Sequence, residues 1–300
     1  MKNSELMQLA RDKGFAKAHF LKPFFCEEGD GKLVHDPQAE YPWAKTVVLL
    51  LMPCALSEDT KEVREGVIAS YYTASQKAYL AARDLADALR KRGIQAAANV
   101  QIPIKPYLLR CKGTVRGLNT LVFDEDLGST FHVQTLFTDE EFDTEEILKP
   151  ATCSSCGICV NACPTGAIKP RGGIVREKCL RFLSEQSPID EKYEELLGNR
   201  LLGCETCQTV CPMNRKAERT QPFTVELQAL LHGEMEQLGQ QIGTNVARKH
   251  RMMMKACTLA ANLLRTDLIP DIEELTHCGY DSVEQAAKHA LERMKDPDCR

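Results

Sequence analysis

Eight of the fourteen cysteines fall at short intervals in the middle of the chain, and this spacing constrains the fold more than any other feature. A first group reads CxxCxxCxxxCP, and a matching CxxCxxxCP end follows further along. Cysteines at these intervals are typical ligands of [4Fe-4S] clusters. We therefore predict two [4Fe-4S] clusters, ligated by Cys153, Cys156, Cys159, Cys163, Cys179, Cys204, Cys207 and Cys211.

The same spacing predicts how the ligands divide between the clusters. In two-cluster ferredoxins the last cysteine of such a run ligates the other cluster, so Cys163 should leave the first cluster and Cys211 should complete it. The second cluster then has Cys163, Cys204 and Cys207, and Cys179 is the candidate for its fourth ligand. Zinc is the alternative metal, but structural zinc sites favour two separated CxxC pairs. The first cluster would be held by Cys153, Cys156, Cys159 and Cys211.

The composition and the apolar runs of the chain indicate a cytoplasmic protein with its own hydrophobic core. A chain of 300 residues can bury a hydrophobic core without disulfides. Residues 1–14 alternate charged and apolar side chains like a surface helix and lack the apolar stretch of a signal peptide. The longest apolar run, 46–56, contains Pro53 and is too short to cross a bilayer as a helix. We therefore expect no membrane segment and no membrane partner.

The charge distribution leaves one interaction open. A formal net charge of −4 argues against a general nucleic-acid coat protein. Two local concentrations of basic residues are usually solvated surfaces, but they leave contact with phosphate groups open. These are Lys105, Arg110, Lys112 and Arg116, and then Arg248, Lys249, His250, Arg251 and Lys255.

Hydrophobic periodicity predicts an α+β protein with three parts. Residues 1–147 read as an N-terminal α/β cofactor-type domain, 148–216 as a bacterial ferredoxin-like double [4Fe-4S] domain, and 217–300 as a C-terminal α-helical, HEAT-like segment. The acidic stretch 139–146 and Pro150 mark the first linker. Expected helices span 4–13, 61–92, 190–197, 246–264, 268–275 and 282–294, and expected strands span 16–21, 46–52, 119–123 and 130–137.

The other cysteines and the histidines show no ligand spacing. A free cysteine usually behaves as a small buried apolar residue, so we interpret these six as structural. The histidines are scattered, with no pair at metal-ligand or acid–base spacing. The cysteines are Cys26, Cys54, Cys111, Cys257, Cys278 and Cys299, and the histidines are His19, His35, His132, His232, His250, His277 and His289.

The segments CSSCGICVNACPTGAI, KCLRFL with Cys179, and GCETCQTVCPMN together resemble the epoxyqueuosine reductases. The resemblance extends more weakly to the front half. It implies a cobalamin bound there, two clusters that supply it with electrons, and an electron donor such as ferredoxin or flavodoxin. The implied substrate is a small molecule, a nucleoside or a tRNA. The cofactor-binding residues implied by the resemblance are Gly117, Asn119, Thr120, Gly128 and Ser129.

One departure from the family concerns the proton donor. Family members carry an aspartate in the segment that corresponds to 100–103, whereas this chain has no carboxylate from 96 to 117. Neither Gln101 nor Lys105 replaces a carboxylic acid without a change in chemistry. We therefore expect a divergent paralogue with a changed active site, and the sequence identifies no catalytic residue and no oligomeric state. The alternatives are an electron-transfer or reductive-activator protein without substrate chemistry, and a tRNA-binding protein without catalysis.

Overall fold

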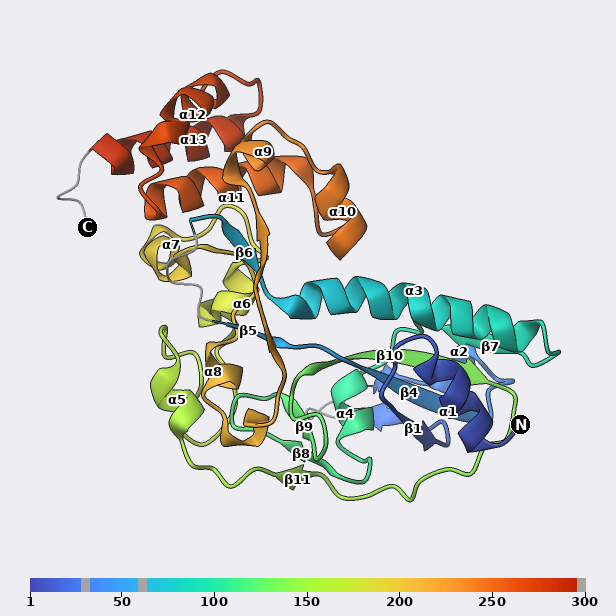
Figure 1. Ribbon diagram of the computed structural model, residues 1–300. Coiled ribbons are helices and arrows are strands. Elements are labelled where there is room, and N and C mark those ends of the chain that lie inside the picture. The colour runs from blue at the N-terminus through green and yellow to red at the C-terminus, as the bar shows by residue number, and fades with distance from the viewer. Residues whose placement is uncertain (28–32, 59–63, 296–300) are drawn as a thin grey trace. The chain divides into compact units, whose positions relative to one another are not determined.

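The computed structural model describes residues 1–27, 33–58 and 64–295 (Figure 1). Its internal contacts divide the chain into two compact units. Unit 1 comprises Met1–Ala55, Ala74–Gly157 and Cys211–Ala217, and unit 2 comprises Leu56–Thr73, Ile158–Val210 and Glu218–Arg300. Each unit is assembled from segments that are distant in sequence. The boundaries of these two units differ from those of the three expected domains. The three-domain division stays a prediction.

Unit 1 is built on a four-stranded antiparallel sheet. Its order is β1 (Lys17–Leu21), β4 (Thr46–Pro53), β10 (Phe131–Thr138) and β7 (Ala96–Ala98). In β4 every residue except Pro53 is buried, which explains its unbroken apolar sequence. The sheet therefore has hydrophobic packing on both faces, and alternate β4 residues belong to different core clusters.

Helices cover the two faces of this sheet. The side chains of Val48, Leu50 and Met52 pack with α1 (Asn3–Arg11) and the unit 1 part of α3 (Ser70–Arg90). Val47, Leu49 and Leu51 pack with α4 (Ile104–Leu108). The remaining elements of unit 1 are α2 (Pro37–Glu40), the pair β2 (Cys26–Glu27) and β3 (Leu33–His35), and the sheet of β11 (Ala151–Thr152), β8 (Thr114–Arg116) and β9 (Val122–Asp124).

Unit 2 combines small sheets with short helices. One sheet has the order β12 (Arg200–Leu202), β6 (Gly66–Ile68) and β14 (Phe223–Val225), and β13 (Arg219–Thr220) pairs with β5 (Leu56–Ser57). The short helices are α5 (Ile158–Ala162), α6 (Leu180–Leu183), α7 (Glu191–Leu197) and α8 (Thr206–Thr209). These short elements lie around the cysteine motifs, where the chain must turn often.

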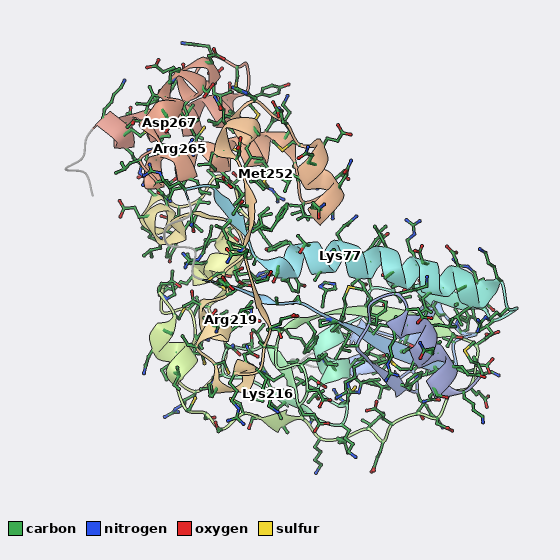
Figure 2. The ribbon with its side chains drawn as sticks, viewed as in Figure 1. Lys77, Lys216, Arg219, Met252, Arg265 and Asp267 are labelled. Atoms are coloured by element: carbon green, nitrogen blue, oxygen red, sulfur yellow. The ribbon has the colours of Figure 1, made fainter. Side chains whose placement is uncertain are left out.

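The C-terminal part of unit 2 is helical. It contains α9 (Leu227–Leu231), α10 (Glu236–Ile242), α11 (Lys249–Asn262), α12 (Ile269–Leu275) and α13 (Asp281–Lys295). All residues of α11 from Met252 to Ala261 are buried, so this helix is the centre of the largest core cluster. Just before α12, the Arg265 guanidinium pairs with the carboxylate of Asp267, which lies in the 3₁₀ helix Thr266–Leu268, at 2.7 Å (Figure 2).

Most expected elements are confirmed, but two are wrong at their start. The strand expected over 119–123 is β9, which begins only at Val122 and ends at Asp124. The long helix does not begin near residue 61: residues 66–68 form β6, and α3 begins at Ser70. Gly66 lies against Leu201 of the neighbouring strand, and this close backbone approach favours a strand over a helical turn. Residues 59–63 lie outside the described residues. Similarly, the tail is not helical directly after Pro222, because β14 comes first.

The HEAT-like character of the C-terminal helices stays a prediction. Across residues 1–27, 33–58 and 64–295, we find no helix with the length and apolar character needed to cross a membrane.

One basic residue expected at the surface is instead buried. Lys255 is 2% exposed, and its Nζ donates to the Leu201 carbonyl at 3.0 Å. Burial, together with the charge of the nearby Arg251 guanidinium, lowers the pKa of Lys255 to about 7. The basic residues between Arg248 and Lys255 therefore do not form one continuous basic surface.

The position of Lys255 predicts a pH effect on stability. Between pH 7 and 10.5 the unfolded chain binds more protons at this residue than the folded chain, so stability should rise with pH across this window. Lys255→Met should abolish this rise and increase stability at pH 7 by roughly 1–3 kcal/mol. Thermal unfolding of the cluster-loaded protein, followed by circular dichroism at several pH values, measures both effects. Lys249→Met, on an exposed position of the same helix, is the matched control and should change neither.

Candidate iron–sulfur site

The eight motif cysteines lie next to short helices and sharp turns. Cys159 is in α5 and Cys207 is in α8, while Cys179 precedes α6 and Cys211 precedes the 3₁₀ turn Pro212–Asn214. Left-handed backbone conformations at Ser155, Gly157 and Gly203 turn the chain beside Cys153, Cys156 and Cys204. Such turns let several thiols from one short segment converge, as cluster ligation requires.

Three of the four expected ligands of the first cluster lie in unit 1. The Cys153 N–H donates to the Arg116 carbonyl at 2.9 Å, which fixes this loop to β8. Burial raises the pKa of Cys211, and the neighbouring Cys156 and Cys153 thiolates raise it further. The structure therefore brings Cys153, Cys156 and Cys211 close enough to interact electrostatically. Cys159, the fourth expected ligand, is assigned to unit 2 by the contacts.

The Cys211 segment is held in place by Asn214. The Asn214 Oδ1 accepts a hydrogen bond from the Ser129 N–H at 2.8 Å, and its Nδ2 donates to Ser129 Oγ at 2.9 Å. Asn214 is 3% exposed, and a side chain at Gly128 would collide with it. The turn at Gly128 and Ser129 thus positions the segment that carries Cys211.

All four expected ligands of the second cluster lie in unit 2, namely Cys163, Cys179, Cys204 and Cys207. The Ala167 N–H donates to Cys163 Sγ at 3.3 Å, and Thr165 Oγ1 lies 3.6 Å from the same sulfur. Burial raises the pKa of Cys163, but these hydrogen bonds outweigh it and leave the pKa below its ordinary value. A thiol that ionises readily suits metal ligation, and hydrogen bonds to ligand sulfurs also tune cluster potential.

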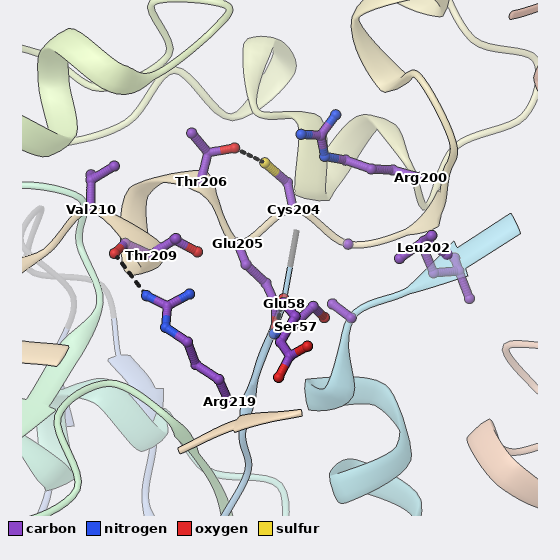
Figure 3. Close-up of a pocket in the computed structure, with 13 residues that line it drawn as sticks. Ser57, Glu58, Arg200, Leu202, Cys204, Glu205, Thr206, Thr209, Val210 and Arg219 are labelled. Atoms are coloured by element: carbon purple, nitrogen blue, oxygen red, sulfur yellow. Dashed lines mark hydrogen bonds between the residues drawn. The ribbon is translucent and has the colours of Figure 1, made fainter. Parts of the chain in front are cut away.

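A cavity of about 540 Å³ opens beside Cys204 in unit 2 (Figure 3). This volume suits a small organic ligand. Its wall is amphipathic: Val67, Leu202 and Val210 are apolar, whereas two arginines, two glutamates and several hydroxyl groups are polar. Thr206 Oγ1 lies 3.4 Å from Cys204 Sγ at this wall. The polar lining residues include Ser57, Glu58, Arg200, Glu205, Thr206, Thr209 and Arg219.

Glu205 is the most perturbed carboxyl group of this cavity. Burial raises its pKa, although the Ser57 hydrogen bond and the charges of Arg219 and Arg200 oppose this. Its Oε2 accepts from the Ser57 N–H at 3.0 Å, and Arg219 is itself tied to the Thr209 carbonyl at 3.5 Å (Figure 3). The cavity beside the second cysteine group therefore offers both cationic and anionic partners to a ligand. The sequence spacing gave no signal for this cavity, because its lining comes from four separate segments.

The five residues implied as cofactor-binding lie in two turns of unit 1. Gly117 and Thr120 close the β8–β9 turn, in which Thr120 has a φ of 64° and the Gly117 N–H donates to the Leu121 carbonyl at 2.9 Å. Asn119 is 4% exposed, and its Nδ2 has no hydrogen-bond partner in the described part of the chain. Gly128 and Ser129 hold Asn214, as above. These residues have clear structural roles, and their role in cofactor binding stays a prediction.

Comparison with known proteins places the cysteine motifs in a characterised domain. Residues 152–214 match the family model described as a 4Fe-4S double cluster binding domain, and this range contains all eight motif cysteines. The chain thus carries a double [4Fe-4S] cluster domain, and the expectation of iron–sulfur clusters is confirmed.

Similarity to whole proteins covers more residues than this domain. The epoxyqueuosine reductase of Listeria monocytogenes is 35% identical over 214 residues, which cover 60% of this chain and 55% of that protein. The epoxyqueuosine reductase of Bacillus subtilis is 26% identical over 212 residues, which cover 61% of this chain and 55% of that protein. The chain resembles the epoxyqueuosine reductases. It spans about half the length of these epoxyqueuosine reductases.

Solved structures agree on the fold. A crystal structure of selenomethionine-labelled epoxyqueuosine reductase matches with a TM-score of 0.81 at 21% identity, covering 98% of this chain and 90% of that one. Epoxyqueuosine reductase solved with a tRNA-Tyr epoxyqueuosine-modified stem loop matches with a TM-score of 0.79 at 20% identity, covering the same shares of the two chains. The expected mixed α+β fold is therefore confirmed as an epoxyqueuosine reductase-like fold.

Proposed function

We propose that this chain is an iron–sulfur reductase related to epoxyqueuosine reductase, with cobalamin as its second type of cofactor. The observation that carries the proposal is the set of eight cysteines within the double-cluster domain, on an epoxyqueuosine reductase-like fold. We assign Cys153, Cys156, Cys159 and Cys211 to the first cluster, and Cys163, Cys179, Cys204 and Cys207 to the second.

The cysteine groups supply what two clusters need. Cys163 accepts a backbone hydrogen bond and has a lowered pKa, so its thiolate is available for iron. The neighbouring Cys156 and Cys153 thiolates help to raise the pKa of Cys211, and iron cations relieve that repulsion. Both groups therefore favour metal binding, and two one-electron clusters can together supply a two-electron reduction.

Unit 1 has a feature that suits cobalamin. The buried Asn119 Nδ2 donor has no partner among the described residues, so an amide or phosphate oxygen of that cofactor that reaches it would satisfy it. We propose that Asn119, with the turns at Gly117–Thr120 and Gly128–Ser129, holds it. When bound, cobalamin would supply a strongly reduced cobalt for two-electron chemistry. The protein residues would orient it and exclude water.

We further propose that the substrate is a modified nucleoside, either free or in tRNA. An epoxyqueuosine reductase of the same fold has been solved with a modified tRNA stem loop, which supports this class of substrate. The cavity beside Cys204 adds a second argument, since its arginines and glutamates offer complementary partners to the polar groups of a nucleoside. A ferredoxin or flavodoxin would supply the electrons.

A plain electron carrier or reductive activator is the second candidate. It is favoured by the absence of any carboxylate from 96 to 117, where the related reductases carry their proton-donating aspartate. A protein that only passes electrons to a partner needs no proton donor, so it would function without a carboxylate in this segment.

Counts of iron, sulfide and cobalt on one sample separate these functions. After anaerobic reconstitution with cobalamin and gel filtration, we expect about eight irons and one cobalt per chain. About eight irons without cobalt would select the carrier. The loaded, reduced protein should then convert an epoxyqueuosine-containing stem loop, with the unmodified stem loop as the control substrate. Retained cobalt without conversion would keep the corrinoid reductase and reject this substrate.

A further inference from the structure

Four side chains that can bind a metal converge in unit 1, away from the motif cysteines in sequence. His19 lies on β1, Cys111 follows α4, Asp124 ends β9, and Glu145 lies in the segment after β10. The ligand atoms of His19, Cys111 and Glu145 all lie within 4.8 Å of one another. His19 and Cys111 are each 2% exposed, and the Glu145 side chain is 27% exposed. The group is thus buried, with one partly exposed member.

Backbone groups hold three of the four side chains of this group. The Lys112 N–H donates to Glu145 Oε2 at 3.2 Å, and the Cys111 thiol donates to the Tyr107 carbonyl at 3.5 Å. The N–H groups of residues 126 and 127 donate to Asp124 Oδ1 at 2.9 and 3.1 Å. The donor atoms are therefore held in place by separate elements before any ligand binds, which lowers the entropic cost of binding.

The imidazole of His19 is only half satisfied. Its Nδ1 lies 2.8 Å from Glu145 Oε1, whereas its Nε2 makes no hydrogen bond to any residue that the structure describes. This Nε2 is 3.8 Å from Asp124 Oδ2. Glu145 and Asp124 thus lie on opposite sides of the imidazole ring, so an ion shared with Glu145 would be ligated by Nδ1, with Nε2 left to face Asp124.

The charges around His19 also favour a cation. Lys17 Nζ lies 2.8 Å from the carboxylates of both Asp124 and Asp126, so it only partly balances the charge of Asp124. Burial lowers the pKa of His19, but the neighbouring Asp124, Cys111 and Glu145 raise it to about 11. With a Cys111 thiolate and a neutral imidazole, three anions face one ammonium group that Asp126 shares, so a divalent cation offsets the excess negative charge.

We propose that His19, Cys111 and Glu145 bind a zinc ion, with Asp124 beside it. A nitrogen, a thiolate sulfur and a carboxylate oxygen form a donor set that zinc accepts in four-coordinate geometry, with a water as the fourth ligand. Binding releases one proton from the imidazolium and one from the thiol, and no electron is transferred. The ion would join three segments of unit 1 and stabilise it. This site is independent of the proposed reductase function.

Zinc K-edge absorption spectroscopy of the full chain tests the proposal, because the iron of the clusters does not contribute at this edge. After expression with added zinc and anaerobic purification, we expect one zinc per chain with a single sulfur at about 2.3 Å and nitrogen or oxygen ligands at about 2.0 Å. A shell of four sulfurs would place the zinc in the motif cysteines and overturn the proposal. A chain without zinc would overturn it as well, leaving a buried ion-pair network.

Substitutions at the partly exposed ligand give a second measurement that does not depend on a disrupted core. Glu145→Gln should weaken zinc binding by 10-fold or more in competition with a chromophoric chelator, while the iron content stays unchanged. Glu146→Gln, at the exposed neighbouring position, is the matched control and should leave zinc affinity unchanged. Equal zinc affinity in the two variants would remove Glu145 from the site.

Discussion

Replacing Cys163 and Cys207 together with alanine should leave about four of the eight irons on the reconstituted chain, because both residues are assigned to the second cluster. Replacing Cys153 and Cys163 together should instead remove nearly all iron, since each cluster then loses a ligand. Each double variant removes two thiols, and Cys163 is removed in both. The two variants therefore differ only in whether both lost ligands belong to one cluster or to two.

This pair of variants tests the exchange of Cys163 and Cys211 directly. If the two motifs do not exchange ligands, the outcomes reverse: the Cys153 and Cys163 variant keeps about four irons and the Cys163 and Cys207 variant loses them all. Iron and sulfide analysis, with electron paramagnetic resonance of the reduced samples, reports the result. Cys278→Ala, outside the motifs, controls for the loss of a thiol and should retain the full iron content.

Gly203→Ala should destabilise the protein by roughly 2–5 kcal/mol. Gly203 has a φ of 91°, and an added Cβ would lie 2.6 Å from the Ala69 Cβ and 3.1 Å from the Tyr72 ring. The substitution thus combines backbone strain with overpacking. Because the next residue is Cys204, we also expect a lower iron content in the second cluster. The apparent Tm of the loaded protein measures the first effect, and iron analysis measures the second.

Gly279→Ala separates the two causes. Gly279 also has a left-handed φ, 80°, but an added Cβ there has no heavy atom within 4 Å. It should therefore cost only the backbone term, about 1–2 kcal/mol, and leave the iron content unchanged. An equal loss of stability in the two variants would show that the contacts of Gly203 with Ala69 and Tyr72 contribute nothing.

The cluster residues were readable in the sequence because their spacing is local. Cys153 to Cys163 lie within one short segment, and the intervals between them are those with which cysteines ligate a cluster. The start of α3 was not readable in this way. Residues 66–68 form a strand only because they pair with β12 and β14, whose residues are distant in sequence.

The group around His19 shows the same limit more strongly. His19, Cys111 and Glu145 come from three segments with no common interval, so each one taken alone looks like a structural residue. Only the pairing of β1 with β4 and the return of the 139–150 segment bring them together. The cavity beside Cys204 could not be predicted from the sequence for the same reason, since β5, β12 and β13 each contribute part of its wall.

The assignment of Cys211–Ala217 to unit 1 has a consequence for biosynthesis. A ribosome translates residues 158–210 before it reaches this returning segment, so unit 1 stays incomplete until most of the cysteine module has emerged. Asn214, which secures the turn at Gly128 and Ser129, arrives last among these contacts. Neither unit can therefore be excised as one continuous fragment, and iron delivery to a nascent chain would meet most of the cysteines before the front unit has closed.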